Sequence, residues 1–117
     1  MSFTEAVISV FTNYANFKGR ATRSEYWYFV LFNMVVGAVL SGLAQASSGL
    51  GIISVLYSLA VFIPGLAVVV RRLHDVGKSG WWYFIVFVPC VGFIILLLDL
   101  IKESQAGDNQ YGPYPFE

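Results

Sequence analysis

The chain contains a run of 45 residues, from Tyr26 to Val70, without one charged side chain. A surface helix of a soluble protein needs a polar face, and a run this long leaves none. Only 12% of all residues are charged, against about 25% in ordinary domains. With 117 residues, the chain lacks the polar surface that a small soluble domain must present. The sequence therefore indicates an integral membrane protein, with residues 1–117 forming a single membrane domain.

The uncharged runs are long enough for three membrane crossings. A bilayer core is about 30 Å thick, and a helix needs about 20 apolar residues to cross it. The first run fits two crossings separated by a turn signal at residues 46–51, and a second uncharged run, Ser79–Leu98, fits one. We expect spanning helices at about 27–45, 50–70 and 81–101. The alternating pattern of barrel strands is absent, so the fold class is all-α.

The N-terminal segment has a different pattern. Ser2 and Glu5 have the spacing of a capping box, which starts a helix. Apolar residues then recur at helical spacing: Phe3, Val7, Val10, Phe11 and Tyr14. We expect a short amphipathic interfacial helix at about residues 2–15. It lies on the membrane surface or packs on the spanning helices, and the sequence favours neither arrangement.

Basic residues lie in two groups, which sets the orientation. Three precede the first span and three separate the second from the third: Lys18, Arg20, Arg23, Arg71, Arg72 and Lys78. Three crossings would put both groups on one side, which the positive-inside rule makes cytoplasmic. Aromatic residues 26–28 and 81–83 suit an interfacial belt on that side. We expect a multi-pass plasma-membrane protein with a cytoplasmic N-terminus and a periplasmic or extracellular tail at 102–117.

Polar residues inside the spans are few. We expect Asn33 to form an interhelical hydrogen bond. Small residues repeat at four-residue spacing in the first span: Gly37 with Ser41, Ala38 with Gly42, and Gly42 with Ala46. Such faces let helices approach closely, either within one chain or in a homo-oligomer. The sequence leaves both possibilities open.

Several functions are disfavoured by composition. The formal net charge is zero, so no basic field would attract nucleic acid. His74 and Cys90 are the only residues of their types, which leaves too few ligands for a zinc site. Asp75 follows His74 directly, and neighbours on a helix point about 100° apart, so this carboxylate would orient the ring poorly. We expect no catalytic, metal or cofactor site and no enzyme, and we identify no small-molecule substrate.

Three stretches resemble a known bacterial family, called domain of unknown function 805. Residues 17–27 (FKGRATRSEYW) are similar to its F-x-G-R-x-x-R-x-E-Y-W motif, and residues 71–82 (RRLHDVGKSGWW) to its R-R-L-H-D-x-G-x-S-G-W-W segment. Residues 107–115 (GDNQYGPYP) look like its G-x-N-x-Y-G-x-x-P ending, with Tyr114 where an aspartate is common. The resemblance implies a small protein of the bacterial inner membrane and no particular activity.

The two basic motifs would meet at one membrane surface. The candidate cluster comprises Arg20, Arg23, Glu25, Arg71, Arg72, His74, Asp75 and Lys78. One interpretation is a helix end with local ion pairs. The other is a site for anionic lipid headgroups or a protein partner, in which Glu25 and Asp75 pair with some of the arginines and surplus positive charge faces the headgroups. We expect a non-enzymatic module that uses this cluster. An oligomeric transport or channel component, and a membrane-embedded enzyme using His74, are the alternatives.

Overall fold

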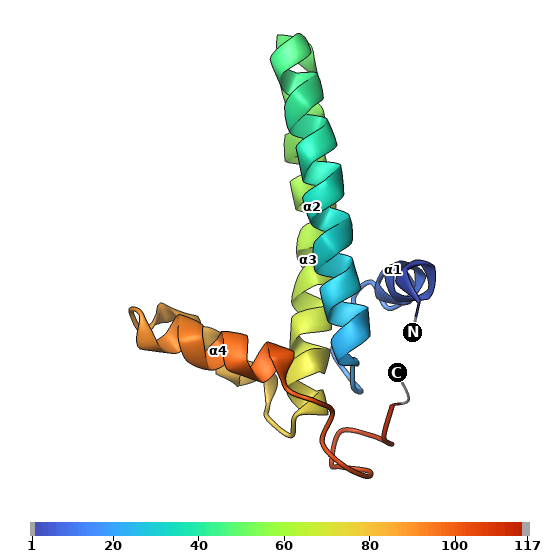
Figure 1. Ribbon diagram of the computed structural model, residues 1–117, viewed down its shortest axis with the longest axis vertical. Helices are drawn as coiled ribbons and strands as arrows, with labels where there is room; N and C mark the ends of the chain where they lie inside the picture. Colours follow the sequence, from blue (N-terminus) through green and yellow to red (C-terminus); the bar gives the residue numbers. More distant parts are fainter. Residues whose placement is uncertain (1, 116–117) are drawn as a thin grey trace.

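The computed structural model describes residues 2–115, and all regular structure in that range is helical. Four α-helices and two 3₁₀ helices follow in the order α1 (Phe3–Thr12), α2 (Arg23–Ala46), η1 (Ser48–Leu50), α3 (Gly51–Asp75), η2 (Gly80–Phe87) and α4 (Val91–Ile101). Figure 1 shows α2 and α3 side by side as a long hairpin, with α1 seen end-on beside α2 and α4 running across the lower end of the hairpin.

The α2–α3 hairpin has the dimensions of a membrane-spanning unit. Its helices have 24 and 25 residues, which at 1.5 Å per residue give lengths of about 36 and 37 Å. Both are apolar and long enough to cross a membrane, and they contain the first two stretches expected to span it. Midway along, the Tyr57 hydroxyl donates a 2.6 Å hydrogen bond to the Asn33 side chain. This bond confirms the predicted interhelical role of Asn33.

Helix α1 packs on the hairpin through one face. Ser2 and Glu5 form the predicted capping box, and the Ser2 hydroxyl, followed by its main-chain amide, holds the pKa of the exposed Glu5 carboxyl below its ordinary value. Ala6 and Val10 are buried, and the Phe11 ring meets Phe29 of α2 edge-on at 5.7 Å between centroids. Packing on the hairpin thus accounts for one side of α1. The opposite side is exposed and includes apolar residues.

The third expected span is not a single helix. Residues 81–101 divide into the short helices η2 and α4, which pack against each other as a second hairpin. Val88 has extended φ and ψ angles, the conformation preferred before a proline, and Pro89 follows it. The expectation of a single helix here is wrong, because the chain turns at residues 88–90.

The tip of the η2–α4 hairpin has a strained and crowded backbone. Cys90 has a positive φ of 64°, which is uncommon for a residue with a side chain. A Cβ atom built on Gly92 would lie 1.6 Å from the Ile85 carbonyl oxygen, so only glycine fits there. Hydropathy alone does not report such a close approach between the two arms.

Two small apolar cores hold these elements together. The first joins α1, α2 and α3 and contains the buried residues Val10, Ala21, Phe29 and Val68. The second joins α3 to the η2–α4 hairpin through Leu73, Leu96 and Leu100. Tyr26 packs against both cores, so the charged end of α2 is fixed between them.

Gly92→Ala should destabilise the protein, because the added methyl group would collide with the Ile85 main chain. Overpacking of this kind costs about 1–3 kcal/mol. Gly42→Ala is the matched control, since a Cβ there meets no atom within 4 Å. We expect Gly92→Ala alone to lower the temperature at which purified protein stops eluting as a monodisperse peak. Equal temperatures for both variants would contradict the close approach.

Candidate functional site

The charged cluster forms where the first turn of α2 meets the last turn of α3. Thr22 caps α2, its hydroxyl oxygen accepting a hydrogen bond from the Glu25 amide. Just before it, the Ala21 amide donates to the Arg71 carbonyl at 3.0 Å, which fixes the preceding loop to α3. The basic and acidic residues of both predicted motifs are thereby brought to one end of the long hairpin.

Asp75 is the centre of this cluster. Its carboxylate accepts hydrogen bonds from Arg20 Nε at 2.9 Å, from Arg72 Nη1 at 2.6 Å and from the Ser104 hydroxyl at 2.5 Å. The Asp75 side chain is 0% exposed, and those of Arg20 and Arg72 are 1% and 0% exposed. A buried carboxylate is tolerated only with such partners, so Asp75, Arg20 and Arg72 are required together.

Arg20 binds the C-terminal tail through main-chain oxygens. Its guanidinium donates to the carbonyls of Gln105 at 2.7 Å, Gly107 at 2.8 Å and Gly112 at 3.4 Å. The Gln105 amide in turn donates to the Asp75 carbonyl at 2.8 Å. The tail is therefore held against the end of α3 through its main-chain groups.

Arg72 and Trp27 bind the end of α4 in a similar way. The Leu100 carbonyl accepts from Trp27 Nε1 at 2.8 Å and from Arg72 Nε at 3.2 Å, and Arg72 also donates to the Lys102 carbonyl. The last carbonyls of a helix lack partners within the helix. Trp27 and Arg72 provide these partners and attach the end of α4 to both long helices.

These contacts place the tail beside the basic loops. Residues 105–112 touch Arg20, His74 and Asp75, so they lie at the same end of the α2–α3 hairpin as the basic loops. The expectation of a tail on the opposite side depended on residues 81–101 crossing the membrane as one helix. A hairpin returns the chain to the end where it started.

A second buried ion pair joins the long helices directly. Arg71 Nη1 donates to the Glu25 carboxylate at 2.7 Å, with the two side chains 4% and 5% exposed. The other guanidinium donors of Arg71, Nε and Nη2, are buried without a hydrogen-bond partner among the described residues. Desolvation therefore costs Arg71 more than its neighbours, and Glu25 is the group that offsets this cost.

His74 is fixed by the loop before α2 and by the tail. Its Nδ1 donates to the Gly19 carbonyl at 3.0 Å, and its ring stacks on Tyr111 with centroids 4.0 Å apart and planes 1° from parallel. The acceptor is a carbonyl, so Nδ1 carries the hydrogen. His74 also lines an apolar hollow of about 360 Å³ between α3 and η2, with Trp81 and Phe84.

Lys78 is directed to the base of the η2–α4 hairpin. Its ammonium binds both carboxylate oxygens of Asp99, at 2.9 and 2.8 Å, and Lys102 contacts the same carboxylate at 3.2 Å. Lys78 also lies 4.8 Å from the centre of the Trp82 ring. It is thus separate from the Asp75 cluster, although the sequence assigned both to one group.

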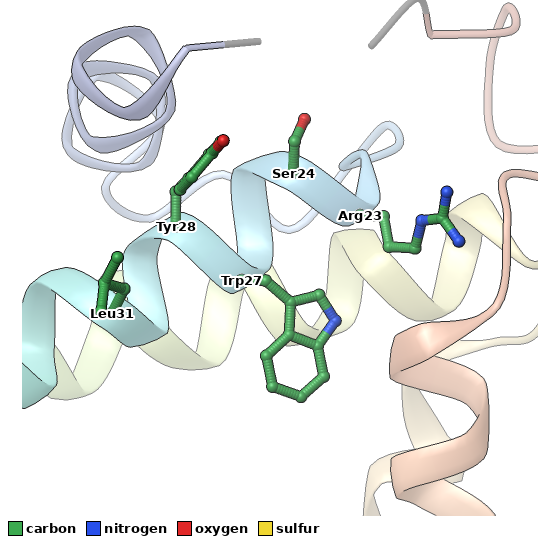
Figure 2. Close-up of a pocket in the computed structure, with 5 residues that line it drawn as sticks. All are labelled: Arg23, Ser24, Trp27, Tyr28 and Leu31. Carbon is green, nitrogen blue, oxygen red and sulfur yellow. The ribbon is translucent and has the colours of Figure 1, made fainter.

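Arg23, the first residue of α2, is half-buried. It lines a hollow of about 400 Å³ together with Ser24, Trp27, Tyr28 and Leu31. Figure 2 shows these side chains leaving the first turns of α2 in order, with the Arg23 guanidinium at the start of the helix and Leu31 farthest along it. The hollow has charge and hydroxyl groups at one end and an apolar surface at the other.

The predicted cluster is thus divided by the structure. Arg20, Glu25, Arg71, Arg72, His74 and Asp75 come together, and their side chains are buried. The three arginines among them pair with Glu25 and Asp75, which confirms the predicted pairing, and Arg20 and Arg72 also bind main-chain carbonyls. Contact between the surplus positive charge and lipid headgroups stays a prediction. The sequence reading missed Ser104, Gln105, Asn109 and Tyr111 of the tail, although the G-x-N-x-Y-G pattern marks that segment. No group of three or more metal-ligating side chains occurs among residues 2–115.

Comparison with known proteins identifies the class to which this arrangement belongs. The family model described as protein of unknown function (DUF805) matches residues 14–113, and the chain belongs to this family. It is 46% identical over 110 residues to inner membrane protein YhaI of Escherichia coli (strain K12), covering 92% of each chain. Inner membrane protein YhaH of the same strain is 38% identical over 113 residues, covering 92% of this chain and 93% of that relative. No solved structure matches the chain significantly.

Asp75→Asn should release the tail, because Arg20 and Arg72 would lose the charge that neutralises them in a buried site. Breaking a buried pair on one side costs about 3–5 kcal/mol. Glu103→Gln removes the same charge at an exposed position and serves as the control. We expect Asp75→Asn alone to lower the thermal midpoint and to make residues 102–115 susceptible to limited proteolysis. A tail equally resistant in both variants would refute the central role of Asp75.

Proposed function

We propose that this protein is a non-enzymatic inner-membrane module that crosses the bilayer twice, through α2 and α3, and binds anionic lipid headgroups at its cytoplasmic end. The binding surface is the hollow beside Arg23, not the buried arginine cluster. The cluster has a structural role: it holds the loop before α2, the end of α4 and the tail together beneath that surface.

The distribution of basic residues supports a cytoplasmic placement of the charged end. All seven lysines and arginines lie in the loops, the tail or the terminal turns of helices at that end, and the η1 turn at the opposite end has none. The positive-inside rule assigns the basic side to the cytoplasm. With the tail at the same end, Lys102 now adds to this asymmetry.

The composition of the Arg23 hollow is the observation on which the proposed binding depends. The Arg23 guanidinium and the Ser24 hydroxyl suit a phosphate, because they offer a charge and a hydrogen-bond donor. Trp27 and Tyr28 belong to residue types that gather at the membrane interface, and Leu31 continues into the apolar part of α2. A lipid would place its phosphate at the first pair and its chains along the last residue.

The surroundings of His74 favour a binding module over an enzyme. The His74 ring bonds to a carbonyl and stacks on Tyr111, whereas Asp75 bonds to Arg20 and Arg72. A general base of the Ser-His-Asp kind needs its carboxylate on the ring nitrogen. No carboxylate among the described residues takes that place.

Arg23→Gln should reduce the amount of phosphatidylglycerol or cardiolipin that purifies with the protein. One arginine near an anionic surface contributes about 1 kcal/mol, which corresponds to about a fivefold weaker affinity after its removal. Lys18→Gln is the matched control, because it removes the same charge from an exposed position outside the hollow. Quantitative lipid extraction followed by mass spectrometry measures the effect. Equal retention in both variants would show that general charge, and not this hollow, holds the lipid.

A further inference from the structure

The η2–α4 hairpin leaves and returns to the same end of the long helices. Gly80 begins η2 five positions after Asp75 ends α3, and the Leu100 carbonyl at the end of α4 is bound by Trp27 and Arg72. The tip, at residues 88–90, is exposed and distant from these anchors in Figure 1. Both ends of the hairpin are thus fixed, while its tip extends away from the long helices.

Each arm of the hairpin is about half a bilayer long. Eight residues of 3₁₀ helix at about 2.0 Å per residue give about 16 Å for η2. Eleven residues of α-helix at 1.5 Å give a similar length for α4. The hydrocarbon core is about 30 Å thick, so neither arm is able to cross it.

The surface of the hairpin is unsuited to water. Side chains around both arms are apolar and exposed, with Trp81 at 77% and Phe87 at 72%. Others are Phe84, Val91, Phe93, Ile94 and Leu98. A monomeric soluble protein rarely presents so large a continuous apolar area. In a protein of the membrane, the medium that covers such a surface is the acyl chains of lipids.

The base of the hairpin is polar in contrast. Asp99 binds Lys78 and Lys102, which precede and follow the uncharged stretch. Lysines at such positions keep their charge near headgroups while their stems lie along apolar surface. Trp82, next to Lys78, is of the type that marks the interface. The hairpin therefore has polar residues suited to the membrane interface at both ends of its base and an apolar surface between them.

From these observations we infer that residues 80–101 are embedded in a single leaflet, the one on the side of the Asp75 cluster, with its acyl chains as their partner. Figure 1 shows α4 running across the α2–α3 pair, so the hairpin extends sideways within this leaflet instead of passing into the opposite one. The inference rests on the proposed membrane placement of α2 and α3, but not on headgroup binding at Arg23. Residues 102–115 then emerge on the side where residues 13–22 lie.

Single-cysteine labelling with a membrane-impermeant maleimide tests the return of the chain. In a Cys90→Ser background, cysteines replace three exposed residues: Ala15 before α2, Ser47 at the η1 turn and Ala106 in the tail. We expect the Ala106 and Ala15 positions to label together, both only after cell lysis, and the Ser47 position to label in intact cells. Labelling of Ala106→Cys together with Ser47→Cys would overturn the inference. If Ala15 and Ala106 both label in intact cells, the cytoplasmic placement fails while the single-leaflet hairpin stands.

The natural cysteine at the tip tests the lipid contact. Cys90 is exposed in the structure but would lie among acyl chains in the membrane. In the unmodified chain, we expect the impermeant reagent to leave Cys90 unlabelled in intact cells and in inside-out vesicles, and to label it after solubilisation in detergent. Labelling in either membrane preparation would place the tip in water and overturn the inference.

Discussion

The buried carboxylate of Asp75 is the constraint on which the rest of the structure depends. A charge removed from water must be matched by neighbouring donors, and Asp75 obtains them from three separate segments: Arg20 before α2, Arg72 on its own helix and Ser104 in the tail. The two arginines are themselves buried and use their remaining donors on main-chain carbonyls. One carboxylate thus specifies where the chain must enter the long helices, where the short hairpin must end and where the tail must lie.

The long helices could be predicted from the sequence because the constraint on them is one of solvent. The run from Tyr26 to Val70 has no charge, and only a helical pair satisfies its backbone in lipid. The same reasoning failed for residues 81–101. Hydropathy records that a segment avoids water, but a hairpin and a crossing helix avoid it equally well. The distinction lies in Pro89 and in the contact between Gly92 and the Ile85 carbonyl, which depends on three-dimensional proximity.

The candidate site divides along similar lines. The sequence predicted that Arg20, Arg71, Arg72 and Asp75 would meet, because charged residues bordering uncharged runs collect at one membrane surface. It did not predict that the tail would accept further hydrogen bonds from Arg20 and Arg72, because every residue has a main-chain carbonyl and the residue type does not show which carbonyls are used. Nor did it separate Lys78, whose partner Asp99 lies 21 positions away at the far end of an uncharged run. Arg23 was predicted as one member of the group, and the structure places it on a different surface.

Arg20 and Arg72 recognise the backbone of the tail and of α4, and this has a consequence for how the protein can vary. A carbonyl oxygen is present whatever the side chain, so residues such as Ala106 and Lys102 are free to be exchanged without loss of these hydrogen bonds. The constraint falls on shape: Gly107 and Gly112 adopt φ values of 68° and 149°, which side chains disfavour. Outside Ser104, Asn109 and Tyr111, whose side chains contact Asp75 and His74, side chains of the tail could therefore vary while the hydrogen bonds to Arg20 and Arg72 are kept. The exposed side chains of the tail could then differ between relatives, while the buried contacts of Arg20, Arg72 and Asp75 are retained.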